Sequence, residues 1–347
     1  MFGESSGHLA LQSRKGEMMN YFKTEGSRLV CLLCAHYCHL KEGQSGICGV
    51  NKNVDGAIKN LVYGYPVAMH VDPVEKKPLY HFLPDTRAFS LGTIGCNFKC
   101  PFCQNWSISQ EKTLQVKEFF EPRNIVEMAL KYECASIAYT YNEPTIFYPY
   151  AKDIAILAHE KGIKNIFVTN GFESSEVIDD MVGIIDAANV DLKSFNHDYY
   201  KKELGGGLEA ILENLKHFKR NGIWVEVTTL IVPTKNDSDA ELTAIASFIA
   251  KELGEQTPWH ISAFHPDYHE QGLPATSIDT LRRAEAIGQK AGLKHIYIGN
   301  VGLENPTKCA KCHTILIKRH RFEVTENYLI EGCCPNCKTK LVGVFDD

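Results

Sequence analysis

The sequence lacks any apolar run near the roughly 20 residues that a membrane-spanning helix requires, and Met1–Lys23 lacks the apolar core of a signal peptide. It also lacks an excess of positive charge, since the formal net charge is -5 at pH 7. Nucleic-acid binding draws on clustered Lys and Arg, so this charge does not support a polyanionic partner. Low-complexity tracts are absent too. We therefore expect a cytoplasmic protein without a membrane or nucleic-acid partner.

The length of 347 residues exceeds a single average domain of roughly 100–200 residues. From Ala88 onward, short apolar runs alternate with helical patterns, which is typical of βα units and a parallel sheet. The expected strands are Ala88–Thr93, Ser136–Thr140, Asn165–Thr169, Ala188–Leu192, Trp224–Val232, Trp259–Phe264 and His295–Ile298. The expected helices are Arg123–Tyr132, Phe147–Glu160, Glu176–Ile185, Leu208–Arg220, Asp239–Leu253 and Ile278–Ala291.

Six or seven βα units fall short of the eight in a closed barrel, so the α/β pattern favours an incomplete (β/α)6 barrel. An open, doubly wound sheet is the alternative, and both architectures place functional residues at the carboxyl ends of the strands. We divide the chain into a polar N-terminal tail, a Cys-rich module, a partial-barrel core and a C-terminal module. These parts span residues 1–25, 26–85, 86–305 and 306–347.

The thirteen cysteines would suggest disulfides in a small secreted protein, but here all except Cys134 fall into three tight groups. Metal binding accounts for these groups better than disulfides do. Cys134 stands alone and is expected to be a buried core thiol. The groups are Cys31, Cys34, Cys38 and Cys48; Cys96, Cys100 and Cys103; and Cys309, Cys312, Cys333, Cys334 and Cys337.

The middle group lies in the run G-C-N-F-K-C-P-F-C-Q between Gly95 and Gln104, directly after the first expected strand. Four cysteine thiolates normally hold an iron–sulfur cluster, so a loop with three leaves one iron of a four-iron cluster open to an exogenous ligand. A structural zinc site or an electron-carrying, ferredoxin-like cluster is the alternative. Either alternative requires a fourth ligand from elsewhere in the fold.

The C-terminal group contains two Cys-x2-Cys pairs separated by 21 residues, which is typical of a zinc ribbon. The four expected ligands are Cys309, Cys312, Cys334 and Cys337. Rubredoxin-type iron would use the same thiolates. Cys333 is an additional thiol that could replace one of these four ligands. We favour zinc with a structural role. The N-terminal group, Cys31, Cys34, Cys38 and Cys48, leaves both a second zinc site and an auxiliary iron–sulfur cluster open.

With Phe102 before its third thiol, the middle loop resembles the C-x3-C-x-aromatic-C loop of the radical S-adenosylmethionine (radical SAM) superfamily. The resemblance implies a TIM-like radical SAM barrel in which Cys96, Cys100 and Cys103 hold a [4Fe-4S] cluster. It also implies that S-adenosylmethionine (SAM) chelates the fourth iron and that one electron cleaves SAM to a 5′-deoxyadenosyl radical. A one-electron donor such as flavodoxin or ferredoxin would supply that electron.

Later strand ends resemble the glycyl-radical-enzyme-activating branch of this superfamily. Asn142-Glu143-Pro144 resembles a turn that binds the SAM amino group, and Thr169-Asn170-Gly171 resembles a loop that faces the cofactor. Asp191-Leu192-Lys193 resembles a segment with a cation-site aspartate and a lysine near the methionine carboxylate, although Val168 replaces an acidic cation ligand. Taken alone, these segments fit an ordinary helix start and an internal ion pair. The candidate cofactor-binding residues are Asn142, Glu143, Thr169, Asn170, Gly171, Asp191, Lys193 and His265.

Residues 31–50, residues 71–83 and the middle loop together resemble the AmmeMemoRadiSam system radical SAM enzymes over nearly the whole chain. The resemblance implies similarity to pyruvate formate-lyase activating enzymes and partners of the Memo-like and AMMECR-domain types. We predict an enzyme with oxidoreductase or lyase-type radical chemistry that abstracts hydrogen from an unidentified substrate. Activation of a glycyl-radical enzyme is one alternative, and a non-catalytic, metal-bearing interaction protein is another. Residues 70–81, with their histidines and the Lys76-Lys77 pair, fit either a functional segment or a solvated loop that covers the barrel mouth, and we favour the loop.

Overall fold

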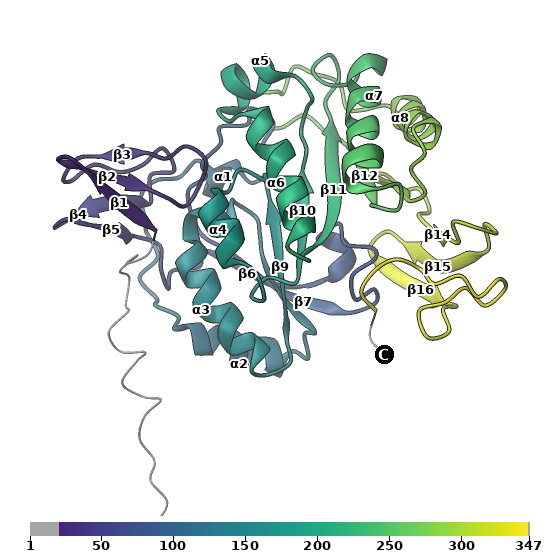
Figure 1. The fold of residues 1–347 in the computed structure, drawn as a ribbon, viewed down its shortest axis with the longest axis horizontal. Helices are drawn as coiled ribbons and strands as arrows, with labels where there is room; N and C mark the ends of the chain where they lie inside the picture. The colour runs from purple at the N-terminus through teal and green to yellow at the C-terminus, as the bar shows by residue number, and fades with distance from the viewer. Residues whose placement is uncertain (1–20, 346–347) are drawn as a thin grey trace, which may run out of the picture.

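The structure is a computed structural model that describes residues 21–345. Within these residues the centre is an eight-stranded sheet with the order β13-β12-β11-β10-β9-β8-β7-β6 (Figure 1). Strands β7 to β13 run parallel, and β6 runs antiparallel to β7 at the edge. The strands are β6 (Ala68–Pro73), β7 (Arg87–Gly92), β8 (Ser136–Tyr139), β9 (Lys164–Thr169), β10 (Ala187–Asp191), β11 (Trp224–Ile231), β12 (Trp259–Ala263) and β13 (Ile296–Gly299). The predicted α/β class and parallel sheet are confirmed, and each expected strand is present to within one residue at either end.

One main helix follows each parallel strand from β7 to β12. These helices are α2 (Pro122–Lys131), α3 (Tyr148–His159), α4 (Ser175–Asp180), α6 (Leu208–Arg220), α7 (Asp239–Phe248) and α8 (Ile278–Lys290). Four apolar residues of α6 recur at helical spacing and are buried, which packs this helix against the sheet: Leu208, Ile211, Leu215 and Phe218. Helix α4 ends at Asp180 rather than at Ile185, and Gly183 has a positive φ of 71° in the turn that follows.

Shorter helical turns complete the connections. Two of them, η3 and η4, are π-helical, and η4 extends α7 to Leu253 as the sequence predicts. Their bounds are η1 (Val74–Lys76), α1 (Trp106–Ser109), η2 (Pro144–Phe147), α5 (His197–Tyr199), η3 (Tyr200–Leu204) and η4 (Ile249–Leu253). Among the described residues, none of the helices is both long and apolar enough to cross a membrane.

The N-terminal module consists of a three-stranded sheet and a hairpin. Its strands are β1 (Phe22–Glu25), β2 (Arg28–Cys31), β3 (His39–Leu40), β4 (Asn51–Val54) and β5 (Ala57–Asn60). Residues 1–20 of the predicted tail lie outside the described residues, and the last residues of that tail form β1. The module contacts the loop after β9, because Ala35 N donates to Phe172 O at 3.0 Å and Ser174 N donates to Leu33 O at 3.2 Å.

Residues 70–81 are not a solvated loop, so that prediction is wrong. The first of them belong to β6, and the following segment, residues 77–83, lies against the inner face of the sheet. Asn189 of β10 donates to Pro78 O at 2.8 Å, and Glu226 of β11 accepts the backbone N–H of His81 at 2.8 Å. The apolar residues Leu79, Tyr80, Phe82 and Leu83 of this segment are all buried and drive its burial. The range predicted for the Cys-rich module therefore includes a strand and an inner segment of the central sheet.

The C-terminal module packs against that inner segment from the side opposite the N-terminal module (Figure 1). Its strands are β14 (Thr307–Lys308), β15 (Ile315–His320) and β16 (Glu323–Asn327). Buried Arg319 donates to Tyr80 O at 2.8 Å, stacks over the Tyr80 ring and lies 3.5 Å from the Glu75 carboxylate. Leu83 N donates to Val344 O at 2.7 Å. A buried ion pair thus joins the module to the central sheet.

Replacing Arg319 with Ala should lower the free energy of unfolding by about 3–5 kcal/mol, because it leaves the buried Glu75 carboxylate without its cation. Equilibrium urea unfolding of the full chain measures the change. The neighbouring variant Lys318→Ala is the control, since Lys318 pairs with Glu326 at a half-exposed position and its loss should cost less than about 1 kcal/mol. Equal costs for the two variants would contradict a structural role for the buried pair.

Candidate functional site

The loop after β7 takes its shape from a glycine and an asparagine. Gly95 has φ +88°, and a Cβ there would lie 2.7 Å from Cys48 O, so a larger residue does not fit. Asn142, from the turn after β8, donates to Gly95 O at 2.9 Å and to the Thr93 hydroxyl at 3.1 Å. Its Oδ1 accepts the Thr93 backbone N–H at 3.1 Å. The side chain of Asn142 therefore fixes the start of the loop.

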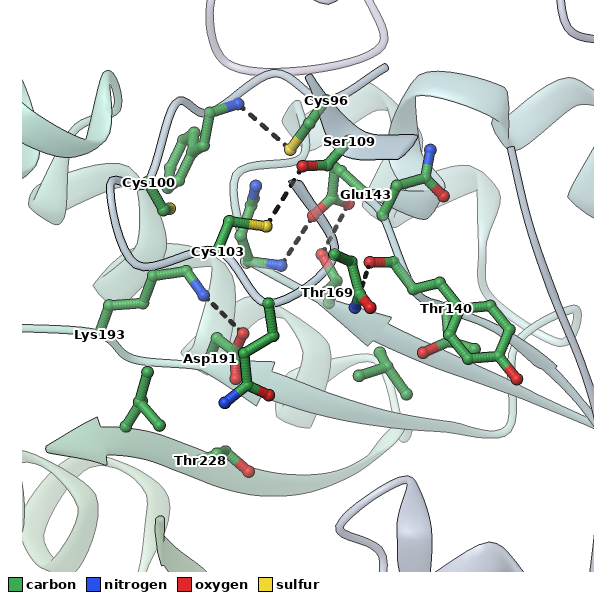
Figure 2. A pocket seen from close by; sticks show the side chains of 18 of the residues that line it. Cys96, Cys100, Cys103, Ser109, Thr140, Glu143, Thr169, Asp191, Lys193 and Thr228 are labelled. Atoms are coloured by element: carbon green, nitrogen blue, oxygen red, sulfur yellow. Dashed lines mark hydrogen bonds and ion pairs between the residues drawn. The ribbon is translucent and has the colours of Figure 1, made fainter. Parts of the chain in front are cut away.

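Three thiols project from this loop toward one cavity of about 270 Å³ at the carboxyl edge of the sheet (Figure 2). Cys96 Sγ accepts the Phe98 N–H at 3.4 Å, and Cys103 Sγ lies 3.2 Å from Ser109 Oγ. Burial raises the pKa of Cys100 to about 12, although the charge of Lys193 opposes that rise. Cys96, Cys100 and Cys103 all line the cavity. The structure thus brings together the three thiols that the spacing singled out.

The same cavity collects most of the predicted strand-end residues. Those that line it with the thiols are Asn142, Glu143, Thr169, Asn170, Asp191 and Lys193. Gly171 instead turns into the core, where its φ is +75° and a Cβ would lie 2.7 Å from Val190 Cγ1. His265 is exposed, with Nε2 2.8 Å from the Gln104 amide nitrogen. Further lining residues that sequence reasoning missed are Asn105, Thr140, Thr228, Ser262 and Asn300. In the sequence, the only indication that these residues line the cavity is their position near a strand end or next to the thiol loop.

Asp191 and Lys193 place a positive charge beside the thiols. Lys193 Nζ lies 2.6 Å from Asp191 Oδ2 in a partly buried ion pair (Figure 2). Burial alone would lower the pKa of Lys193, but the Asp191 carboxylate and the Cys100 thiol outweigh burial and raise that pKa. The backbone of Lys193 is fixed as well, because Asn236 donates to its carbonyl at 2.6 Å. A held cation next to a cavity can bind an anionic ligand group.

The Glu143 carboxylate is occupied by hydrogen bonds within the protein. Its Oε1 accepts the N–H and hydroxyl of Thr145 at 3.0 and 2.7 Å and the Thr169 hydroxyl at 2.9 Å. Its Oε2 accepts the Asn170 N–H at 2.8 Å. Because Glu143 follows β8 and the Thr169–Asn170 pair follows β9, this carboxylate joins two neighbouring strand ends. A buried residue with these partners acts on the site through the loops that it positions.

Glu173 forms a second buried carboxylate beside Glu143, and no sequence signal indicated it. Its Oε1 accepts the hydroxyls of Thr169 and Thr145 at 2.5 and 3.0 Å, and its Oε2 is buried without a hydrogen-bond partner within residues 21–345. Each hydroxyl carries one hydrogen and cannot donate to both carboxylates at once. Burial, followed by the charge of Glu143, raises the pKa of Glu173, so we expect this pair to retain a proton.

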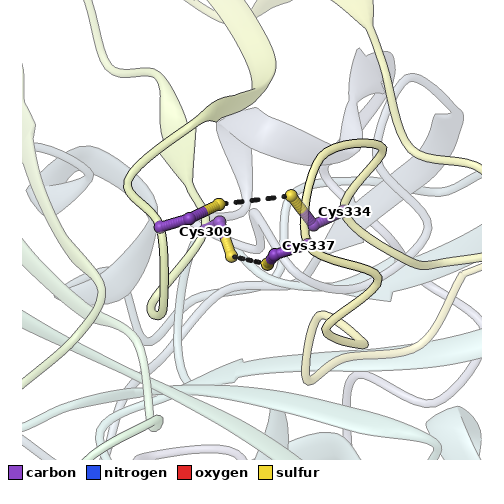
Figure 3. Close-up of side chains that lie close together, drawn as sticks. Cys309, Cys334 and Cys337 are labelled. Carbon is purple, nitrogen blue, oxygen red and sulfur yellow. Dashed lines mark hydrogen bonds between the residues drawn. The ribbon is translucent and has the colours of Figure 1, made fainter.

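The C-terminal thiols form a compact site of another kind (Figure 3). Cys309 and Cys337 lie 3.5 Å apart at Sγ, and Cys312 and Cys334 lie 3.6 Å apart. A tetrahedral ion with Zn–S bonds of about 2.3 Å separates its thiolates by about 3.8 Å, so these four fit a single ion. Among the described residues, they are the only group of three or more His, Cys, Asp or Glu ligand atoms within 4.8 Å of one another. The N-terminal thiols, Cys31, Cys34, Cys38 and Cys48, line a separate cavity.

Comparison with known proteins gives related sequences for most of the chain. A family model described as the radical SAM superfamily matches residues 91–249. The uncharacterized protein MJ0808 of Methanocaldococcus jannaschii is 43% identical over 309 residues, which are 88% of this chain and 92% of that protein. MJ1227 of the same organism, provisionally named a glycyl-radical enzyme activating enzyme, is 29% identical over 60% of this chain and 84% of its own length. The pyruvate formate-lyase 1-activating enzyme of Escherichia coli K12 is 21% identical over 58% of this chain and 89% of its own length.

Glu173→Gln should reduce the change in the free energy of unfolding between about pH 5 and about pH 8. The folded protein keeps a proton on Glu173 that the unfolded chain releases, so the free energy of unfolding falls as pH rises from about 5 to about 8. Glutamine does not titrate, and the variant should lose part of this decline. Urea unfolding at several pH values measures it, with Glu176→Gln as the control. Although burial opposes them, hydrogen bonds hold the pKa of that exposed carboxyl below its usual value, so its removal should not reduce the decline between about pH 5 and about pH 8. Parallel curves for wild type and Glu173→Gln would show that Glu173 is ionised in the fold.

Proposed function

We propose that the chain is a radical SAM enzyme related to glycyl-radical enzyme activating enzymes and that it reductively cleaves SAM to form a 5′-deoxyadenosyl radical. The match of the superfamily model to residues 91–249 and the similarity to activating enzymes support this proposal. The observation that carries the proposal is the loop with three thiols, which opens directly onto a cavity lined by strand ends. In this proposal the sheet is the incomplete (β/α)6 barrel of the superfamily. An unidentified substrate donates the hydrogen atom that the radical takes.

The residues present fit a [4Fe-4S] cluster and SAM. Cys96, Cys100 and Cys103 would hold three irons, and the adjoining cavity leaves room for a ligand at the fourth. When bound, the cluster supplies the electron that cleaves the SAM sulfonium bond. The protein's own contribution is to hold these thiols at the carboxyl edge of the sheet and to enclose the site.

Lys193 is proposed to bind the carboxylate of the SAM methionine, with Asp191 holding the lysine in place. The ammonium group of Lys193 is the charge complement of a carboxylate, and Asp191 fixes its position at 2.6 Å. For the SAM amino group we propose the backbone carbonyls of the turn after β8, because the Glu143 carboxylate is already occupied. Asn142 and Glu143 are therefore positioning residues. The same holds for Thr169, whose hydroxyl is directed at the two buried carboxylates.

Two further assignments extend the proposal. We assign zinc to the C-terminal thiols, where it would stabilise the module that closes the inner segment of the sheet. The resemblance to AmmeMemoRadiSam enzymes supports Memo-like and AMMECR-domain proteins as partners. Flavodoxin or ferredoxin remains the proposed electron donor. The His265 ring, exposed beside Gln104, is proposed to contact the outer part of the bound cofactor.

Cys100→Ala should abolish cleavage of SAM. Anaerobically reconstituted wild-type protein, given dithionite and SAM, should release 5′-deoxyadenosine and methionine, which chromatography quantifies. Cys134→Ala is the matched control, because Cys134 lies outside the three thiol groups and should leave turnover unchanged. If wild-type protein with a full iron complement forms no deoxyadenosine with any low-potential reductant, the proposed function is wrong.

Lys193→Met should weaken SAM binding to the reconstituted protein by about 10–100-fold, because a hydrogen bond to a charged group contributes about 1.5–3 kcal/mol. Equilibrium dialysis with labelled SAM measures the dissociation constant. Lys235→Met is the control: Lys235 pairs with Glu203 and Glu270 and should not affect affinity. Unchanged affinity in Lys193→Met would exclude the proposed carboxylate contact, while retained deoxyadenosine formation would leave the cleavage itself in place.

Activation of a glycyl-radical enzyme is a second candidate, favoured by the similarity to two activating enzymes. In that case the substrate is a backbone glycine of a partner protein. The two candidates differ in the product. A protein-centred glycyl radical in a partner polypeptide supports activation, whereas deuterium transfer from a small molecule into deoxyadenosine supports an independent substrate.

A further inference from the structure

The four N-terminal thiols share one small, largely enclosed cavity next to the thiol loop of the main site. The cavity is lined by Cys31, Cys34, Cys38 and Cys48. The backbone is tight around it: Cys31 N donates to Cys38 O at 3.0 Å, and a Cβ on Gly46 would lie 3.5 Å from Cys38 Sγ. Three of the thiols are buried, and Cys38 is partly exposed. The arrangement is a built ligand site.

The spacing of these thiols separates them from the C-terminal zinc-type set. At the C-terminus all four sulfurs lie within 4.8 Å of one another, whereas within residues 21–345 no three N-terminal thiols meet that limit. A single tetrahedral ion holds four thiolates about 3.8 Å apart, while a four-iron cluster binds each thiolate to a different iron and spreads them further. We propose that Cys31, Cys34, Cys38 and Cys48 hold a second iron–sulfur cluster, of the [4Fe-4S] type.

Amide groups around the cavity provide donors for the sulfur atoms of such a cluster. Asn51 Nδ2 lies 3.5 Å from Cys48 Sγ and also donates to Ile146 O at 2.9 Å. Asn97 lines the cavity, is 1% exposed, and its Nδ2 has no hydrogen-bond partner within the described part of the chain. A buried donor without an acceptor is costly, and cluster sulfur would accept from it. The Cys48 thiolate would accept from Asn51 with either metal, whereas the bridging sulfides of a cluster add acceptors that a zinc ion lacks.

The second site directly contacts the loop of the first. His36 Nε2 lies 2.9 Å from Asn97 O, and Asn97 is bonded in sequence to Cys96. On the other side, Gly95 packs so closely on Cys48 O that a Cβ would lie 2.7 Å away. The two sets of thiols therefore lie on touching loops, one open to solvent at Cys38 and the other facing the main cavity.

This contact gives the second cluster a role that rests on the proposed function. One electron passes from a reduced flavodoxin or ferredoxin to the N-terminal cluster, and from there to the cluster on the thiol loop. The donor is oxidised by one electron and the loop cluster is reduced by one. No bond forms or breaks and no proton moves. The partly exposed side at Cys38, next to the exposed Ile47 side chain, is where the donor would approach.

The site is tested in the full chain without the first cluster. The triple variant C96A/C100A/C103A, reconstituted anaerobically with iron and sulfide, should be brown and hold about four irons and one zinc per chain. Adding Cys34→Ala and Cys48→Ala to it should remove the iron, whereas adding Cys134→Ala should not. Wild-type protein should hold about eight irons, which covers the case in which the variants fail to fold.

Two outcomes would overturn the second cluster. One is a colourless triple variant with two zinc ions or with no metal beyond the C-terminal zinc. The other is iron that persists after Cys34 and Cys48 are replaced. These measurements do not depend on SAM cleavage, so the failure of the proposed function and the failure of this site are distinguishable.

The relay is tested in the Cys34→Ala/Cys48→Ala variant with the thiol loop intact. Deoxyadenosine formation driven by reduced flavodoxin should fall at least about tenfold, while formation driven by dithionite should change by less than about twofold, because the small reductant can reach the loop cluster directly. An equal loss with both reductants, or no loss with either, would overturn the relay and leave the metal content of the site as measured.

Discussion

The turn after β8 is the point on which the candidate active site depends. The Asn142 side chain fixes the loop that follows β7, and the neighbouring Glu143 carboxylate fixes the loop that follows β9. Parallel strands bring their carboxyl ends to the same edge, but the loops that leave them are held only by such contacts. Asn170 also donates directly to Asn97 Oδ1 of the thiol loop at 2.7 Å. The turn after β8 and this contact together hold the two loops that enclose the cavity.

Buried charge is used differently at the two edges of the sheet. At the carboxyl edge Glu143 and Glu173 share hydroxyl donors, and neither forms an ion pair within residues 21–345. A retained proton lowers the free-energy cost of burying both carboxyls. At the opposite edge Glu75 is paired with Arg319 of the C-terminal module. Burial raises the pKa of Glu75, but the cation of Arg319 opposes the rise. The Glu143–Glu173 pair therefore holds a proton at the candidate site. The Glu75–Arg319 pair joins the C-terminal module to the central sheet.

The three thiol groups differ in the spacing of their sulfur atoms and in the cavities that they line. These differences indicate which kind of metal group each could hold. The C-terminal set is compact enough for one ion, while the loop set opens onto a cavity. The N-terminal thiols line an enclosed cavity, and within residues 21–345 no three of them lie within 4.8 Å of one another. Because their loop touches the thiol loop through Cys48 and Gly95, a metal there would influence the main site directly. The N-terminal module therefore contacts the thiol loop of the candidate site, whereas the C-terminal module contacts the inner segment of the sheet.

The sequence by itself determined the βα order, the strand positions and the thiol groups, because apolar periodicity and ligand spacing are local properties. It could not determine that residues 77–83 lie inside the sheet, since their burial depends on partners such as Glu226 and Arg319 that are far away in the chain. Glu173 was missed for the same reason. Its raised pKa depends on burial beside Glu143, which the sequence around a single acidic residue does not reveal. The separation of the N-terminal thiols was likewise decided by tertiary structure, because spacing along a chain does not fix distances across a folded loop.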